Sequence, residues 1–381
     1  MSKGWTSRER VQAILDHTEP DRVPISLPMT VAAYKKLRQY LGFAPGKPIL
    51  KTDYDEAIID PDVARFLGVD LACIRLHSLP GKKPANESVF YDPWHIGRRL
   101  YESEPGIFFL ETVESPLASA HFEDLKAFPW PDPHDPAWVE GLEKEAHDLF
   151  TGTELALVGR LGGSILDVAR DLRGEDQWYE DLAENPDFAC ALLNRIASLQ
   201  IELDGAGLAA AGKYLSIIEI CEPEQVHGEN RNFHFPKNIL QQTIHPVLTR
   251  RLQAVRQGIK RYAARAKLMF SSTFPPFMHF QEMIEDGVNL FGALQPGFLD
   301  LNFAALKREY GKSLSFYGGV DEYNLLSPNN ENDVRQNVKT CLEQLGAGGG
   351  FVLAPTRILQ AGSLPQNIVA MCETVKVYGR Y

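Results

Sequence analysis

Short apolar runs recur along the chain, and each is followed by a polar or glycine-rich loop and, in most cases, by a helical pattern. A run of four to eight apolar residues between such loops is typical of a buried strand. Eight runs of this kind are present, at residues 23–27, 70–75, 156–160, 214–221, 267–271, 288–293, 314–317 and 351–354. The pattern therefore predicts eight strands.

Helical periodicity fills most of the intervals between the later runs. The predicted helices lie at residues 178–203, 236–264, 280–286, 303–310 and 332–345, and a further helix at 7–17 precedes the first run. Strands that alternate with helices pair in parallel through right-handed crossovers. The chain is therefore expected to be a single α/β domain over residues 1–381, a (β/α)8 TIM barrel with an N-terminal helical extension. A doubly wound sheet with an extra unit is the alternative.

Two long insertions interrupt the repeat early in the chain, at residues 28–69 and 76–150. The second contains the tetrapeptide Tyr-Asp-Pro-Trp at 91–94 and an apolar stretch at 108–113, which together predict an inserted hairpin. The proline-rich tract at 128–136 is short, so we interpret it as a rigid surface connection and not as a linker between domains.

Charge narrows the classes of partner. The 381 residues include 50 acidic and 39 basic ones, which gives a formal net charge of -11. An acidic protein is repelled by phosphate backbones and by anionic membranes, so we exclude both as main partners. The N-terminus lacks the apolar segment of a signal peptide, and no stretch reaches the roughly 18 apolar residues of a membrane span. We expect a cytoplasmic protein whose five scattered cysteines are reduced.

The active site of such a barrel lies at the C-terminal ends of the strands, and this rule selects candidate residues. The richest loop follows the fourth run, where Glu222, Glu224 and His227 stand close together. They could bind a metal or serve as an acid–base pair, and a solvated polar loop is the alternative. Arg357 follows the last run, where it could pair with a substrate carboxylate or with a neighbouring loop. The other positions that the rule selects include Met29, His77, Arg160, Ser272, Gln295, Tyr317 and Asp321.

Seven segments spread over nearly the whole chain form a recognisable set. They are RERVQAILDHTEPDRVP (8–24), GVDL (68–71), PWPDP (129–133), DLAENP (181–186), QPG (295–297), FYGGVD (316–321) and GGGFVLAP (348–355). This set resembles the uroporphyrinogen decarboxylase superfamily, which also contains the corrinoid-dependent methyltransferases. The resemblance implies a (β/α)8 barrel, in agreement with the count of strands.

Within that family, the site pattern resembles the methyltransferase-like branch. True uroporphyrinogen decarboxylases have an arginine-rich loop after the first strand, whereas residues 28–31 are Pro-Met-Thr-Val here. The methyltransferase branch typically binds zinc through a His-x-Cys pair after the fifth strand, and the matching positions look like Phe270, Ser271 and Ser272. Phenylalanine cannot bind zinc and serine binds it poorly, so we expect no zinc and predict no metal site.

Tyr317 and Arg357 stand where members of the family often have histidines. Without zinc to activate a thiol, the resemblance implies a methyltransferase that moves a methyl group from a small methoxylated aromatic donor to a corrinoid (cobalamin) carried by a partner protein. The implied catalytic residues are Tyr317, Glu222, His227 and Asp321. The implied substrate-binding residues are Arg357, Met29, His77, Phe270, Ser272 and Gln295.

Two other functions stay open at this point. One is a carboxy-lyase for a small carboxylate, in which Arg357 holds the acid and Asp321 or Glu222 manages the proton. The other is a non-catalytic protein that binds a small molecule or a corrinoid. The oligomeric state is also open, with a homodimer among the alternatives.

Overall fold

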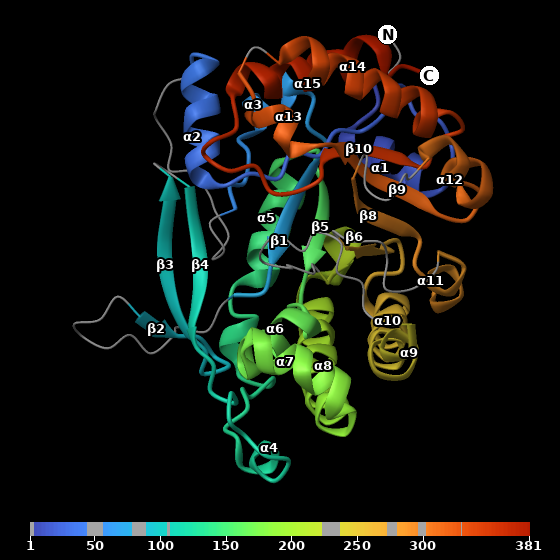
Figure 1. Ribbon diagram of the computed structural model, residues 1–381. Coiled ribbons are helices and arrows are strands. Elements are labelled where there is room, and N and C mark those ends of the chain that lie inside the picture. The colour runs from blue at the N-terminus through green and yellow to red at the C-terminus, as the bar shows by residue number, and fades with distance from the viewer. Residues whose placement is uncertain are drawn as a thin grey trace.

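The computed structural model describes residues 4–43, 56–77, 89–104, 107–222, 237–272, 280–295, 302–328 and 330–381. Within these ranges, parallel strands form one central sheet in the order β1-β5-β6-β7-β8-β9-β10 (Figure 1). Their bounds are Leu71–Arg75 (β1), Ala156–Arg160 (β5), Leu215–Cys221 (β6), Lys267–Ser271 (β7), Leu290–Leu294 (β8), Ser315–Val320 (β9) and Phe351–Pro355 (β10). Each strand coincides with one of the predicted apolar runs.

The remaining predicted run, at 23–27, joins the two edges of this sheet. Ile25 forms parallel bridges both to Val69, just before β1, and to Leu353 of β10. The backbone N–H of Ser26 donates to Leu353 O at 2.9 Å, and the N–H of Asp70 donates to Ile25 O at 2.8 Å. The segment thus takes the place of an eighth strand, and the predicted TIM-barrel fold is confirmed.

Most helices of the described chain surround the sheet on its outer side, but the first lies at the N-terminal end of the barrel and the fourth lies in the second insertion (Figure 1). The helices are Ser7–Leu15 (α1), Val31–Tyr40 (α2), Pro61–Leu67 (α3), Asp124–Ala127 (α4), Leu142–Gly152 (α5), Ile165–Arg173 (α6), Glu175–Glu184 (α7), Pro186–Ala211 (α8), Lys237–Ile239 (α9), His245–Tyr262 (α10), Phe280–Asp286 (α11), Phe303–Tyr310 (α12), Glu322–Leu326 (α13), Glu331–Cys341 (α14) and Pro365–Tyr378 (α15). The helix predicted at 178–203 is divided into α7 and α8 at Asn185, because Pro186 lacks the N–H that would continue α7. No helix in the described ranges is both long and apolar enough to cross a membrane.

The second insertion contains the predicted hairpin. Its strands Val89–Tyr91 (β2), Gly97–Glu104 (β3) and Ile107–Glu114 (β4) form an antiparallel sheet of their own, which stands beside the barrel (Figure 1). Arg98 of β3 donates to Asp171 of α6 at 2.6 Å and to Asp92 at 2.9 Å. The pair with Asp171 fixes the base of the hairpin to the body of the protein, and the pair with Asp92 lies within the insertion.

Alternate residues of the barrel strands belong to two separate hydrophobic clusters, and this shows which side chains face inward. The interior cluster contains Val11, Ile14 and Leu15 of α1 together with the strand residues Leu71, Ala156, Val158, Ile217, Met269, Leu290, Tyr317, Val352 and Ala354. The outer cluster packs the other faces of the strands against the surrounding helices. Helix α1 therefore closes the N-terminal end of the barrel, and the C-terminal end is left for a site.

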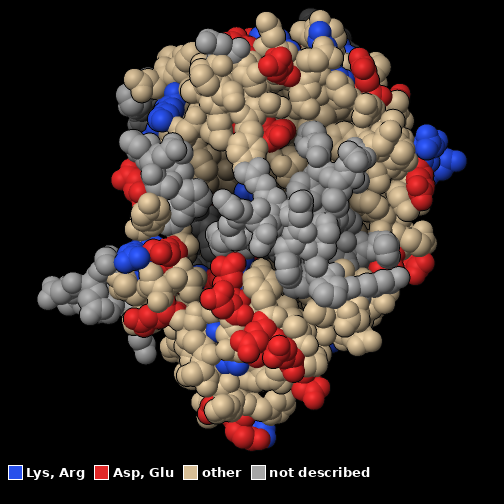
Figure 2. Space-filling model, viewed as in Figure 1, with Lys and Arg blue, Asp and Glu red and all other residues tan. Residues whose placement is uncertain are grey.

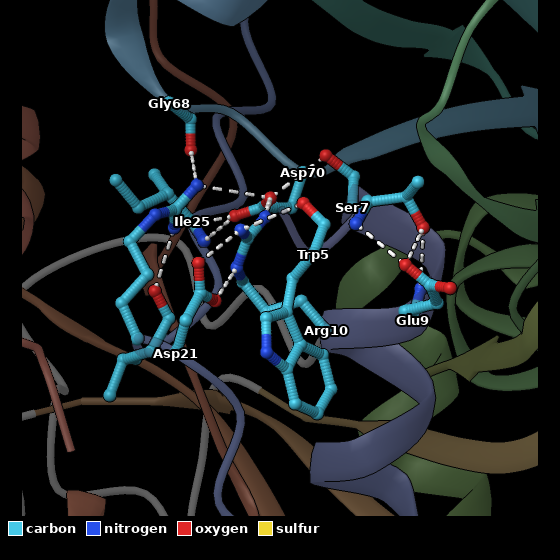
Figure 3. Close-up of polar contacts among 11 residues, drawn as sticks. Trp5, Ser7, Glu9, Arg10, Asp21, Ile25, Gly68 and Asp70 are labelled. Atoms are coloured by element: carbon cyan, nitrogen blue, oxygen red, sulfur yellow. Dashed lines mark hydrogen bonds and ion pairs between the residues drawn. The ribbon is translucent and has the colours of Figure 1, made fainter. Parts of the chain in front are cut away.

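Asp70, which directly precedes β1, is the centre of a buried polar network at the N-terminal end (Figure 3). Its carboxylate accepts hydrogen bonds from Arg10 at 2.6 Å, Arg22 at 2.8 and 3.1 Å, Ser7 Oγ at 2.9 Å and the Ile25 N–H at 2.9 Å. The network joins α1, the 23–27 segment and β1. It therefore fixes the closure of the barrel.

Candidate active site

Charged side chains meet inside the barrel near the C-terminal ends of β1, β5 and β6. The interior cluster contains Leu71 of β1, Val158 of β5 and Ile217 of β6. Arg75, Arg160 and Glu219 lie an even number of residues further along the same strands, so their side chains also face the interior. Arg160 donates from Nε to Glu219 and from a terminal nitrogen to Glu56 Oε2 at 3.2 Å. Arg75 donates to the same oxygen of Glu56 at 2.9 and 3.1 Å. These four residues, in the order Arg75, Glu56, Arg160 and Glu219, are called the interior ion cluster.

Glu56 reaches this cluster from outside the central sheet. An isolated bridge to Thr30 holds its backbone, and its side chain is almost fully buried. Burial alone would raise the pKa of the Glu56 carboxyl, but the guanidinium groups of Arg160 and Arg75 outweigh burial and hold this pKa below its ordinary value. Glu56 is therefore ionised at neutral pH.

We expect Glu56→Gln to lower the free energy of unfolding by about 2 kcal/mol at neutral pH, because two buried guanidinium groups lose a charged partner. The folded pKa of Glu56 lies below the ordinary 4.5, so its stabilising contribution is fully present above that value and is lost as the pH falls through the folded pKa. Urea unfolding at neutral pH and at about pH 3 should show a difference between wild type and variant that shrinks in acid.

The control for this experiment is Glu143→Gln. Glu143 forms an exposed ion pair with Lys213, and such pairs contribute little to stability. Its substitution should leave the unfolding curve unchanged at both pH values. An equal loss for Glu56→Gln at both pH values would show that its charge contributes nothing.

Tyr317 of β9 lies beside the interior ion cluster. Its hydroxyl donates to Ser26 Oγ at 2.8 Å, and the ring is 6% exposed. Burial raises the pKa of the Tyr317 phenol, with Arg160 opposing and Glu219 reinforcing the shift. The phenol is therefore neutral at physiological pH and acts as a hydrogen-bond donor. A small cavity opens here, and its lining includes Ser26, Pro28, Glu56, Cys73, Arg160 and Tyr317.

Two thiols lie in the same interior, Cys73 on β1 and Cys221 on β6. Burial raises the pKa of each thiol to about 12, and neighbouring carboxylates act in the same direction, Glu56 and Glu219 on Cys73 and Glu219 and Glu222 on Cys221. Both cysteines are therefore thiols and not thiolates at neutral pH. Within the described ranges, His, Cys, Asp and Glu side chains do not gather in groups of three or more that could hold a metal ion.

Glu222 follows β6, but its carboxylate is directed away from the cavity into a second polar network. It accepts hydrogen bonds from Ser164 Oγ at 2.7 Å, the Ile165 N–H at 2.9 Å, the Leu166 N–H at 3.2 Å and Arg251 at 3.1 Å. Three of these donors belong to the N-terminus of α6, so Glu222 caps that helix. With its oxygens occupied and its side chain 0% exposed, Glu222 is placed as a structural residue and not as the predicted proton donor.

Asp321 and Arg357 lie after β9 and β10, at the rim of the barrel. Asp321 Oδ1 accepts the Tyr323 N–H at 3.0 Å and so caps α13. Arg357 pairs with Glu322 of α13 at 3.3 Å, and 52% of its side chain is exposed. The salt bridge considered for Arg357 is therefore present, and its guanidinium still has free surface for a ligand.

Phe270 and Met29 differ from their predicted role as substrate contacts. Both are fully buried in the outer cluster, beneath the helices. On β7, Met269 faces the interior, and the alternation of a strand then turns Phe270 outward. Neither residue is placed to touch a ligand inside the barrel.

The other predicted contacts are dispersed. His77 lies 3.9 Å from Glu145 of α5, Gln295 directly follows β8, and Ser272 is buried directly after β7. His227 and Glu224 lie outside the described residues. Of the residues that the sequence selected and the structure describes, Arg160 belongs to the interior ion cluster and Tyr317 lies beside it.

Four residues of the site were absent from the predicted set: Glu56, Arg75, Glu219 and Ser26. Glu219 had a readable signal, because it is the one charged residue within the apolar strand Leu215–Cys221. Arg75 is the last residue of β1, just as Arg160 is the last residue of β5. The rule that selects Arg160 by its place at a strand C-terminus therefore applies to Arg75 as well. Glu56 offered no such signal, because it lies within an insertion and reaches the site only in the folded chain.

No family model and no curated protein matches this chain. Among solved structures, a methyltransferase from Methanosarcina mazei matches with a TM-score of 0.60 at 16% identity, covering 98% of this chain and 99% of that one. The GH53 catalytic domain of Ignisphaera aggregans matches with a TM-score of 0.40 at 10% identity, covering 93% of this chain and 96% of that chain. The first similarity supports the fold over the whole chain, and the second is too weak to carry an argument.

Proposed function

We propose that this protein is a methyltransferase that moves a methyl group from a small methoxylated aromatic donor to a corrinoid held by a partner protein. The observation that carries this proposal is the Tyr317–Ser26 pair, a neutral hydrogen-bond donor system beside a buried ion cluster. The similarity in fold to a methyltransferase over the full chain supports it. We place the reaction in the cytoplasm, as the sequence predicts.

The charge balance of the interior favours an uncharged reacting group. The interior ion cluster contains two guanidinium groups and two carboxylates, and each group is paired within it. A carboxylate inserted there would bring an uncompensated charge into a buried site, which costs several kcal/mol. An ether oxygen brings none. A ring carboxylate on the same donor would stay at the rim, where Arg357 is exposed.

The Tyr317–Ser26 pair supplies what the leaving oxygen requires. When the methyl carbon departs to the acceptor, negative charge develops on the former ether oxygen and must be stabilised. Ser26 accepts the hydrogen bond of Tyr317, so its own hydroxyl hydrogen is available to a ligand in the cavity that both residues line. The raised pKa of Tyr317 keeps its phenol protonated, so this hydrogen bond persists throughout the physiological pH range.

The corrinoid is the methyl acceptor and therefore a substrate brought by another protein. Its carrier must approach the C-terminal end of the barrel, next to α6 and α7. Figure 2 shows acidic side chains gathered over these helices, and Glu175 and Asp176 lie in the first turn of α7. We expect the carrier to present a basic surface to this region.

A carboxy-lyase is the second candidate, because Arg75 and Arg160 are guanidinium groups of the kind that bind a substrate carboxylate. In this reaction the substrate acid would have to displace Glu56 from both arginines. Release of carbon dioxide from candidate acids distinguishes this activity from methyl transfer.

The proposed function is tested by incubating the enzyme with a reduced, validated corrinoid partner protein and a panel of methoxybenzoates. We expect a change in the absorbance of the corrinoid and a stoichiometric amount of the demethylated phenol. The control is the matching panel of hydroxybenzoates, which have no methyl group to give. The absence of any change across the methoxybenzoate panel would refute the proposal.

A further inference from the structure

Ser271, the last residue of β7, has a buried hydroxyl that lacks a hydrogen-bond partner in the described part of the chain. The side chain is 3% exposed. It faces the barrel interior, because Met269, two residues earlier on the same strand, belongs to the interior cluster. A buried polar atom without a partner costs about 1–3 kcal/mol, so its persistence calls for an explanation.

The neighbouring strand leaves space for this hydroxyl. Gly292 of β8 is the register partner of Ser271, and a Cβ atom at Gly292 would lie only 2.0 Å from Ser271 Oγ. Any side chain at position 292 would therefore displace the hydroxyl. The adjacent Ala293 adopts a left-handed backbone with φ of 59°, which is costly for a residue with a side chain. The register between β8 and β9 also shifts at this point.

Ser271 lies on the same interior face of the sheet as Tyr317, two strands away. Ser271, Gly292 and Tyr317 each directly follow a phenylalanine, and these three phenylalanines are register partners on β7, β8 and β9. Ser271 and Tyr317 are therefore in register, two strand spacings apart, which is roughly 10 Å between backbones. An aromatic ring with oxygen atoms at two positions, and with a hydrogen bond at each of them, spans a separation of this order.

We infer that Ser271 is a specificity-determining residue that forms a hydrogen bond with a second oxygen substituent of the aromatic ligand, while the Tyr317–Ser26 pair receives the methoxy oxygen. This role of Ser271 rests on the proposed function. It narrows the class of methyl donor to aromatic rings that carry a hydroxyl or ether oxygen in addition to the reacting methoxy group. Gly292 acts through Ser271 as a positioning residue, because it keeps the hydroxyl in place.

The test compares the binding of two probes by titration calorimetry, 3-methoxybenzoate and 4-hydroxy-3-methoxybenzoate. Wild type should bind the hydroxylated probe about threefold to tenfold more tightly, the value of one hydrogen bond between uncharged groups. Ser271→Ala should lose this preference, and so should Gly292→Ala, which displaces the hydroxyl. Equal binding of both probes by wild type, no binding of either, or an unchanged preference in Ser271→Ala would overturn the inference.

Thermal unfolding of the ligand-free protein provides an independent readout. Ser271→Ala removes an unpartnered hydroxyl, so the Tm should stay unchanged or rise. The matched control is Ser315→Ala, because Ser315 is also buried in the barrel but its hydroxyl donates to Ile14 O at 3.4 Å. We expect this control to lower the Tm and to keep the probe preference. A lower Tm for Ser271→Ala would contradict the inference, because it would reveal a partner within the protein.

Catalytic turnover plays no part in these measurements. A protein that keeps the preference for the hydroxylated probe but transfers no methyl group would contradict the proposed function alone. A protein that transfers methyl groups without that preference would contradict the role of Ser271 alone.

Discussion

Replacing Asp70 with asparagine lowers the free energy of unfolding by about 3–5 kcal/mol, the cost of removing one charge from a buried ion pair. The carboxylate is fully buried and accepts hydrogen bonds from Arg10, Arg22, Ser7 and Ile25. An amide has the same shape but lacks the charge, and it directs N–H groups at guanidinium donors. Because domains are stable by roughly 5–15 kcal/mol, urea unfolding should show a large fall in the midpoint.

The matched control for this substitution is Asp62→Asn in α3. Asp62 also forms an ion pair with an arginine, Arg65 at 3.0 Å, but both side chains are more than three-quarters exposed, at 78% and 77%. Exposed pairs contribute about 0–1 kcal/mol, so the midpoint should hardly move. If the two variants lost the same stability, the Asp70 network would not be what holds the barrel closed.

The Asp70 network also explains what the sequence resemblance could and could not predict. Arg10 and Arg22 lie in the segment 8–24, and Asp70 lies in the segment 68–71, two of the segments that carry the resemblance. These residues act at the N-terminal end of the barrel, where they fix its closure and lie far from a site at the strand C-termini. The resemblance therefore predicts the fold more securely than the reaction.

Strand positions were predictable, but the direction of their side chains was not. The run 267–271 is apolar because both of its faces are buried, and such a run lacks the polar alternation that reveals which side faces inward. The prediction therefore assigned Phe270 to the site, whereas Met269 and Ser271 face the interior. Only the packing of the closed barrel decides which of the two alternating sets of side chains faces the interior.

For polar residues near the strand ends, the sequence does not show which partners their side chains bind. Glu222 stands at the predicted strand end, but its role depends on Arg251 and on the N-terminus of α6, which lie far from it in the sequence. Conversely, Glu56 lies in an insertion and becomes part of the site through Arg75 and Arg160. Sequence position predicts which residues are near the barrel mouth, while the partners of each charge are set by tertiary contacts.

Replacing Tyr317 with phenylalanine should lower kcat for methyl transfer by about 10²-fold, the lower end of the range for a lost oxyanion donor, because Ser26, which donates to the developing oxyanion, loses the phenol that orients it. The change deletes only the hydroxyl that donates to Ser26 and leaves the buried ring in place. Ser26 can then donate its hydrogen elsewhere, so its hydrogen bond to the ligand is no longer directed. KM should change much less, because the ring carboxylate still has Arg357 available at the rim.

The matched control is Tyr34→Phe, because Tyr34 is also a buried tyrosine with a bonded hydroxyl. Its hydroxyl donates to Asp60 Oδ2 at 2.9 Å and accepts the Asp60 N–H at 2.8 Å, in the outer cluster beneath the helices. Both variants should lose about 1–3 kcal/mol of stability, because each leaves a buried polar group without its partner. Only Tyr317→Phe should lose turnover. An equal fall of kcat in both variants would trace the loss to stability, and an unchanged kcat in Tyr317→Phe would remove Tyr317 from the reaction.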